Sequence, residues 1–412
     1  MIDFSRHTLK NGLRVLLHQD NSSPIMALNV LYDVGARDED PAQTGFAHLF
    51  EHLMFGGSVN IPEFDRVLES VGGQNNAFTS NDITNYYITV PKSNIETALW
   101  LESDRMLSLA FSEKSLEVQR QVVIEEFKQN YLNQPYGDTS FLIRKLAYKT
   151  HPYQWPTIGK DLSHIEEAKM EDVKAFFSKF YAPNNAVLCL SGDFDLDEMK
   201  AQIERYFGSI PSQIIPTRNL NSEPKQTEAR LLEVEREVPN DTLYKAYRMA
   251  GKYDSDFQAS DILSDLLSQG KSSILYQKLI KEQGIFIDIS SYVGGSYDPG
   301  LFYIVGRPKA GIDLKTADLA LENVLQEFIN QPVDIKALEK IKNKFEVAER
   351  YNQLSVLNKA MALCEAELSG DADRVNTQLE DYRNVSPDQV LSVAKQILNP
   401  TQCSTLYYRA KT

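Results

Sequence analysis

The pattern of apolar and polar residues along the chain predicts strands and helices in alternating groups. Apolar and polar residues alternate around Lys10-Asn11-Gly12, an Asn-Gly turn signal, and "IMALNVLYDVG" continues as a buried strand. A short helix in "IPEFDRVLESVGG" precedes two more strands, "NNAFTS" and "NYYITV", and long helices follow at roughly 93–110 and 113–132. This alternation predicts an α/β fold, an α+β sandwich in which helices cover a mostly antiparallel sheet.

A polar segment divides the chain near its middle. The stretch "IPSQIIPTRNLNSEPKQTEAR" has three prolines and no apolar period, which indicates a linker. We therefore predict an N-terminal domain at 1–210, a linker at 211–229 and a C-terminal domain at 230–412.

The sequences on the two sides of this segment resemble each other. "NYYITVPK" matches "FYIVGRPK", and "EDVKAFFSKFYAPNNAVLCL" matches "PDQVLSVAKQILNPTQCSTLYY". The offset from Pro91 to Pro308 is the same as the offset from Pro183 to Pro400. Either match alone is weak, because proline turns commonly follow helices. Two matches at one offset predict homologous domains that face each other across a cleft, as half of a clam-shell.

The most informative motif is "HLFEH" within "GFAHLFEHLMFGGS". Residues four apart share one face of a helix, so His48 and His52 can reach one metal ion. Glu51 lies about 100° around the helix from His52, where its carboxylate can act as a general base. Catalytic zinc takes three such ligands and keeps one position open. The alternative is a pair of hydrogen-bonded core histidines, but burying three ionisable groups in so apolar a helix is costly unless they are paired or metal-bound.

The third ligand is predicted in "VQRQVVIEEFKQNYLNQPYG". Glu125 and Glu126 point about 100° apart on a helix, so only one of them can reach the ion. Val122 and Val123 precede Glu126 by one turn, which places it nearer the buried face and favours it over Glu125. The alternative is that both belong to a solvated acidic edge.

These motifs resemble the pitrilysin family of inverted-motif (HxxEH) zinc metallopeptidases, which includes insulysin and mitochondrial processing peptidase. The resemblance rests on HxxEH, on the later Glu in "VVIEEF" and on "NQPYG", and it extends over the whole chain. It implies that His48, His52 and Glu126 hold one Zn²⁺ per chain and that Glu51 is the catalytic base. It also implies that Asn76, Ala77, Phe78 and Thr79 form an edge strand that binds an extended peptide substrate.

Two departures from the family pattern affect the predicted activity. Gln119 stands where many members of the family carry a further Glu. We expect this change to weaken a contact that supports a metal ligand, without removing the zinc. In "LYQKLIKEQGIFIDI", Ile280 and Ile287 occupy the places of a family Arg and Tyr. Neither isoleucine can donate a hydrogen bond to a substrate carbonyl or an oxyanion. The resemblance therefore implies a homologous partner subunit that supplies the Arg and Tyr, or otherwise a homodimer.

Composition narrows the possible functions and locations. The 412 residues are 42% hydrophobic and carry a formal net charge of −14, which argues against nucleic-acid binding. Cys189, Cys364 and Cys403 are too few and too scattered for a disulfide framework. No apolar run is long enough for a membrane span, and the start shows no signal peptide. We therefore expect a cytoplasmic protein, or a periplasmic one if a presequence has been removed.

The sequence thus predicts a zinc-dependent endopeptidase, the zinc-bearing subunit of a heterodimer, that hydrolyses peptides or unfolded segments in a chamber. The rival hypothesis is a non-catalytic assembly or scaffold subunit that retains a metal site. Glu51 argues against the rival because metal binding needs only the ligands, whereas Ile280 and Ile287 argue for it.

Overall fold

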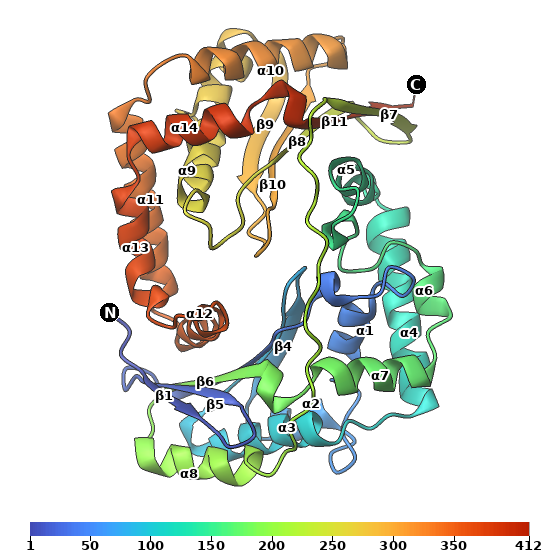
Figure 1. Ribbon diagram of the computed structural model, residues 1–412, viewed down its shortest axis with the longest axis vertical. Coiled ribbons are helices and arrows are strands. Elements are labelled where there is room, and N and C mark those ends of the chain that lie inside the picture. Colours follow the sequence, from blue (N-terminus) through green and yellow to red (C-terminus); the bar gives the residue numbers. More distant parts are fainter. Residues whose placement is uncertain (412) are drawn as a thin grey trace. The chain divides into compact units, whose positions relative to one another are not determined.

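The computed structural model describes residues 1–411 and divides into two compact units. Each unit is an α+β layer structure with one sheet (Figure 1), which confirms the predicted fold class. The chain crosses between the units several times: unit 1 comprises 1–130, 155–220 and 350–377, and unit 2 comprises 131–154, 221–349 and 378–412, of which 378–411 are described.

Unit 1 is built on a six-stranded sheet of order β1-β2-β6-β3-β5-β4. Only the β2–β6 pair is parallel. The strands are β1 (Ser5–Thr8), β2 (Arg14–Gln19), β3 (Ile25–Tyr32), β4 (Gln74–Thr79), β5 (Thr84–Pro91) and β6 (Ala186–Gly192). The predicted turn at Gly12 joins β1 to β2, with a φ of 89° that suits glycine.

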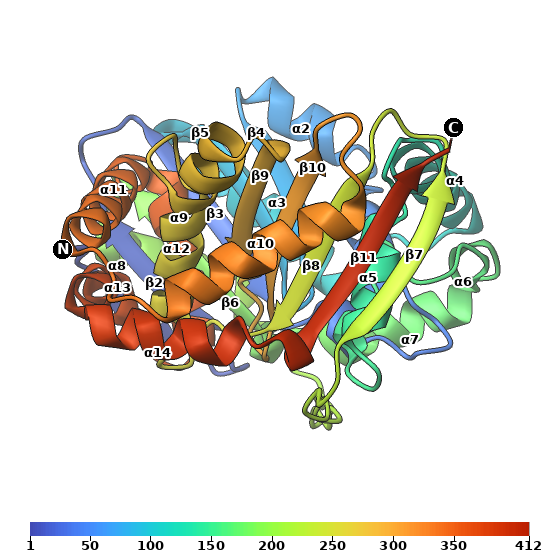
Figure 2. The ribbon, with the colours of Figure 1, turned by 90° about the horizontal axis from the view of Figure 1, so that it is seen from above.

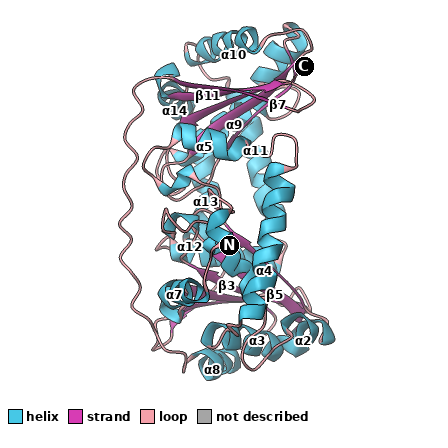
Figure 3. Cartoon of the chain, turned by 90° about the vertical axis from the view of Figure 1, so that its right-hand side faces the viewer, coloured by secondary structure: helices cyan, strands magenta, loops and turns pink. Residues whose placement is uncertain are grey.

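Helices cover both faces of this sheet. The helices wholly within unit 1 are α1 (Phe46–Leu53), α2 (Phe64–Ser70), α3 (Ile95–Leu107), α4 (Glu113–Phe127), α6 (Ser163–Glu166), α7 (Met170–Phe180), α8 (Leu196–Phe207) and α12 (Val356–Leu368). Helix α12 packs on β3 and β6, and α3 packs on β3 and β5. The two lie on opposite sides of the sheet (Figures 1 and 3). The long helices predicted near 93–110 and 113–132 thus correspond to α3 and to α4 with its π-helical extension Lys128–Leu132.

Unit 2 has a five-stranded sheet of order β7-β11-β8-β10-β9, in which only β7–β11 is parallel. Helix α10 crosses its strands (Figure 2), α9 packs on β9, and α14 packs on α9 and α10. Helix α5 packs on β7, β8 and β11. Its elements are α5 (Thr139–Ala147), β7 (Arg230–Arg236), β8 (Thr242–Arg248), α9 (Phe257–Ser268), β9 (Phe286–Val293), β10 (Leu301–Pro308), α10 (Leu314–Ile329), α14 (Pro387–Ile397) and β11 (Cys403–Ala410). Helices α11 (Ile335–Asn352) and α13 (Arg374–Asn384) span the unit boundaries.

The two sheets share one strand order once β1 is set aside. The pairs β3/β8, β5/β10, β6/β11 and α7/α14 all begin at one constant offset along the chain, the offset that separates Pro91 from Pro308, which supports the duplication. Helices α5 and α12 begin at this offset as well, yet each belongs to the unit built mainly from the other half of the chain. Residues 211–229 hold no helix or strand. The predicted division into domains at 1–210 and 230–412 therefore stays a proposal about the two duplicated segments of the sequence. The compact units are defined by packing, and they do not coincide with those segments.

Candidate metal centre

Helix α1 is amphipathic, and its apolar face anchors it in unit 1. Phe46, Ala47, Leu49, Phe50 and Leu53 are buried, whereas the remaining positions of the helix are His48, Glu51 and His52, all partly exposed. The motif therefore occupies the face of α1 that the core leaves free. Burial of the apolar face fixes the direction in which the three polar side chains point.

Three side chains from two helices converge at one point. Nε2 of His48 lies 3.3 Å from Nε2 of His52. Oε2 of Glu126, on α4, lies 3.6 Å from Nε2 of His48 and 3.4 Å from Nε2 of His52. Among the described residues, this is the one group of His, Cys, Asp and Glu side chains close enough to hold a metal ion.

The structure separates the two candidate glutamates on α4. Glu125 points away from the histidines, and its Oε1 accepts a hydrogen bond of 2.8 Å from Nζ of Lys128. Its side chain is 68% exposed, against 34% for Glu126. Glu126, the glutamate on the more buried face of the helix, is therefore the one that joins the cluster.

The electrostatic environment favours protonation states of His48 and Glu126 that suit metal binding. Burial lowers the pKa of His48 to about 4, with a smaller contribution from His52 and an opposing one from Glu126. The interaction with His52 lowers the pKa of Glu126, against the effect of its burial. At neutral pH His48 is therefore a neutral imidazole and Glu126 a carboxylate, the states that a metal requires of its ligands.

The donor set and its spacing fit zinc. Nitrogen and oxygen ligands lie about 2.05 Å from zinc, and at tetrahedral angles they are then about 3.3 Å apart. The observed separations of 3.3, 3.4 and 3.6 Å are close to that value. Nδ1 of His48 is buried without a hydrogen-bond partner, so Nε2 is the nitrogen through which this residue meets other groups.

Glu51 stands beside the cluster without joining it. Burial raises the pKa of its carboxyl group, while Thr79 and the neighbouring His52 oppose that rise. A carboxyl group with a raised pKa is suited to accept a proton and to pass it on near neutral pH.

Strand β4, which contains Asn76 to Thr79, is the terminal strand of its sheet. It pairs with β5 on one side only. The backbone N–H of Ala77 donates to Oδ1 of Asn76 at 2.8 Å, and the backbone amide of Thr79 is directed at Glu51. Residues two apart in a strand present their amides to the same edge, so the open edge of β4 runs past Glu51.

Ile280 and Ile287 lie in unit 2. Ile280 is in the π-helical segment Tyr276–Glu282 and packs against the apolar core, whereas Ile287 is on β9 and is 52% exposed. Both side chains are apolar, so neither side chain can donate a hydrogen bond.

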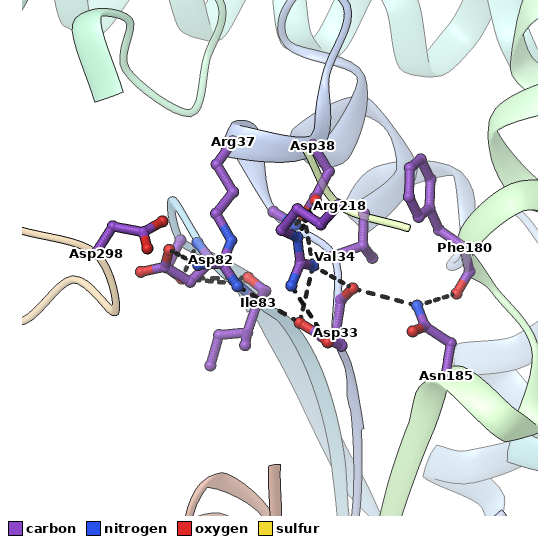
Figure 4. A network of polar contacts seen from close by, with 12 residues as sticks. Asp33, Val34, Arg37, Asp38, Asp82, Ile83, Phe180, Asn185, Arg218 and Asp298 are labelled. Atoms are coloured by element: carbon purple, nitrogen blue, oxygen red, sulfur yellow. Dashed lines mark hydrogen bonds and ion pairs between the residues drawn. The ribbon is translucent and has the colours of Figure 1, made fainter. Parts of the chain in front are cut away.

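Polar residues outside the motif hold the segment before α1, and no sequence pattern indicated their role. The carboxylate of Glu39 accepts hydrogen bonds from the backbone N–H groups of Gly45 and Ala47. Arg37 and Asp38, which precede it, are ion-paired within unit 1 (Figure 4). The run "ARDED" stands out in the sequence as a cluster of charged residues, but the sequence does not show which of these charges are buried.

The fold is a two-domain α+β fold with a cluster of side chains that could hold a metal ion, and comparison with known proteins places the chain in a family. Residues 14–159 match the profile described as "Insulinase (Peptidase family M16)", and residues 168–345 match "Peptidase M16 inactive domain". The chain belongs to peptidase family M16, which confirms the resemblance to pitrilysin. His48, Glu51, His52 and Glu126 all fall within the first match.

Individual relatives agree with this assignment. The chain is 28% identical over 409 residues to "Zinc protease PqqE" of Helicobacter pylori, covering 98% of this chain and 92% of that protein. The crystal structure of a protease from Helicobacter pylori matches with a TM-score of 0.93 at 28% identity, over 99% of this chain and all of that one. Pitrilysin shares the fold, with a TM-score of 0.81 at 17% identity, over all of this chain and 45% of that one.

No helix of residues 1–411 combines the length and the apolar character needed to cross a membrane.

Proposed function

We propose that this chain is a zinc-dependent endopeptidase that hydrolyses peptides or unfolded segments. The convergence of His48, His52 and Glu126 at separations that fit zinc, with Glu51 alongside, carries the proposal. The relatives named zinc proteases support zinc as the metal.

In this proposal His48, His52 and Glu126 hold one zinc ion per chain. When bound, zinc supplies Lewis-acid polarisation of the scissile carbonyl and makes water a stronger acid. Glu51 takes the proton from the attacking water and later delivers it to the leaving amine. Because burial raises the pKa of Glu51, the protonated form that this transfer requires is accessible.

The substrate pairs with the open edge of β4, at Asn76, Ala77, Phe78 and Thr79. Main-chain hydrogen bonds to an added strand are independent of side chains, so the site accepts varied sequences but requires an extended backbone. An incoming carbonyl replaces Oδ1 of Asn76 as the acceptor for the N–H of Ala77. A peptide paired with this edge of β4 runs alongside Glu51, so its scissile bond can lie next to the Glu51 carboxylate.

The zinc-bearing chain acts with a homologous partner subunit that supplies the Arg and Tyr. Apolar side chains at Ile280 and Ile287 support this division of the site, since neither can stabilise an oxyanion. The second candidate function is a non-catalytic assembly subunit that retains its metal site. The same two isoleucines favour it, as does the match of the second half to a domain described as inactive.

One experiment decides between them. Zinc content and hydrolysis of an unstructured quenched-fluorescence peptide are measured for the chain alone and mixed with a homologous subunit encoded beside it. Stoichiometric zinc, with hydrolysis in the mixture only, supports the split peptidase. Stoichiometric zinc without hydrolysis in any mixture favours the assembly subunit, and rapid hydrolysis by the lone chain contradicts the need for a partner.

The edge strand gives a separate prediction. Ala77→Pro removes an N–H group that faces the open edge and takes no part in the pairing with β5. We expect the KM for an extended peptide to rise by about tenfold, which corresponds to the loss of roughly one hydrogen bond at about 1.4 kcal/mol. Zinc content should not change. An unaltered KM in a folded variant would show that substrates do not pair with β4.

A further inference from the structure

The metal-bearing helix α1 begins at a residue that cannot cap it with a side chain. Its N-cap is Gly45, whose φ of 90° lies in the left-handed region. A Cβ atom at this position would meet the carbonyl oxygen of Ile158 at 2.7 Å, so space as well as conformation restricts the position to glycine. The first amides of a helix have no intrahelical acceptor, and another group must therefore satisfy them.

Glu39 supplies the missing cap from six residues earlier. Its Oε2 accepts a hydrogen bond of 2.9 Å from the N–H of Gly45, and its Oε1 accepts one of 2.9 Å from the N–H of Ala47. The indole Nε1 of Trp155 donates to Oε2 at 3.1 Å. Glu39 is 5% exposed, so these contacts are shielded from water.

The segment that carries Glu39 is itself held in place (Figure 4). The buried guanidinium of Arg37 lies 3.1 Å from Oδ1 of Asp82 and 3.6 Å from Oδ1 of Asp33. Asp38 pairs with Arg218 at 2.6 Å, and Arg218 also reaches Asp33 at 2.9 Å. Ion pairs at residues 37 and 38 thus fix the backbone directly before Glu39.

We propose that Glu39 is a positioning residue for the metal centre: its carboxylate fixes the first turn of α1 and thereby the placement of His48. Ala47, whose N–H it binds, is the residue next to His48. A negative charge at a helix N-terminus also complements the helix dipole. The inference rests on the proposed zinc function, but it concerns a residue that touches neither the metal ligands nor the substrate strand in any contact described above.

The chemistry of these contacts requires the carboxylate form. All three partners of Glu39 are N–H donors, so both oxygens must act as acceptors. Burial raises the pKa of the carboxyl group, whereas the hydrogen bonds from Gly45, Ala47 and Trp155 favour its ionised form against that rise. Glu39→Gln keeps the shape but turns an NH₂ group toward N–H donors, whereas Glu39→Asp keeps the charge and shortens the reach.

The test compares zinc affinity by chelator competition in the full chain, wild type against Glu39→Gln and Glu39→Asp. We expect Glu39→Gln to bind zinc at least about tenfold more weakly, the lower end of the effect of altering groups that orient metal ligands. Glu39→Asp should recover part of that loss. The absorption spectrum of the Co²⁺-substituted chain should shift in Glu39→Gln, since it reports ligand geometry and not stability.

Glu367→Gln is the matched control. Glu367, like Glu39, is a buried glutamate of unit 1, on α12, but it pairs with Arg6 at 2.6 Å. Its replacement should lower the unfolding temperature without changing zinc affinity or the cobalt spectrum. Wild-type affinity and an unchanged spectrum in Glu39→Gln would overturn the inference; if that variant does not fold, the same result in Glu39→Ala, which removes the acceptor altogether, would do so. A wild-type chain that binds no zinc would instead overturn the proposed function.

Discussion

Glu51→Gln should leave zinc bound and reduce peptide hydrolysis by about 100-fold to 10,000-fold, the contribution of a positioned general base. Glutamine has the shape of glutamate but cannot take the proton of the attacking water. Because burial raises the pKa of Glu51, the pocket already tolerates its neutral form, and the variant should fold normally. The measurement is the rate of cleavage of a quenched-fluorescence peptide by the zinc-loaded chain mixed with the proposed partner subunit.

The control for this prediction is the zinc content of the Glu51→Gln chain. Zinc content and unfolding temperature should be those of the wild type, which shows that the lost activity comes from proton transfer. Cleavage at the wild-type rate by a zinc-loaded Glu51→Gln chain would mean that another group is the base. Loss of zinc together with activity would place Glu51 among the ligands, against the observed convergence of His48, His52 and Glu126.

The local features of the fold were predictable because short-range physics determines them. A continuous apolar run placed β3, and strand-forming runs placed β4 and β5. The apolar residues around the motif indicated helix α1, and His48 and His52 lie on the face of that helix that the core leaves free. The choice of Glu126 over Glu125 followed from the helix face that Val122 and Val123 indicate, and only Glu126 joins the cluster.

Long-range packing was not predictable in the same way. Helix α5 is amphipathic and helix α12 is mostly apolar in sequence, but no local pattern shows that each packs in the unit formed mainly by the other half. Glu39 lies in a charged run that is typical of a solvated loop, yet it is buried against the start of α1. Its role depends on Gly45, which offers no side-chain cap, and on Trp155, which is distant in sequence.

Glu126→Gln should weaken zinc binding by more than about 100-fold, whereas Glu125→Gln should not change it. Loss of a group that merely orients a ligand costs about 10-fold to 100-fold, so loss of a charged ligand should cost more. The two variants make the same chemical change at adjacent positions of one helix. Only Glu126 lies within 3.6 Å of both histidine Nε2 atoms, while Glu125 pairs with Lys128 on the exposed side.

The zinc affinities of Glu126→Gln and Glu125→Gln are compared by calorimetry or chelator competition at neutral pH. Equal affinity in the two variants, whether reduced or wild-type, would contradict the assignment of Glu126 as a ligand. Together with Glu51→Gln, the Glu126→Gln variant distinguishes hydrolysis lost through loss of zinc from hydrolysis lost through loss of the general base. Glu126→Gln should lose zinc and hydrolysis together, and Glu51→Gln should lose hydrolysis alone. A metal centre that serves only assembly gives no reason for Glu51 to stand beside it, so this separation of the two losses is the result that a peptidase predicts.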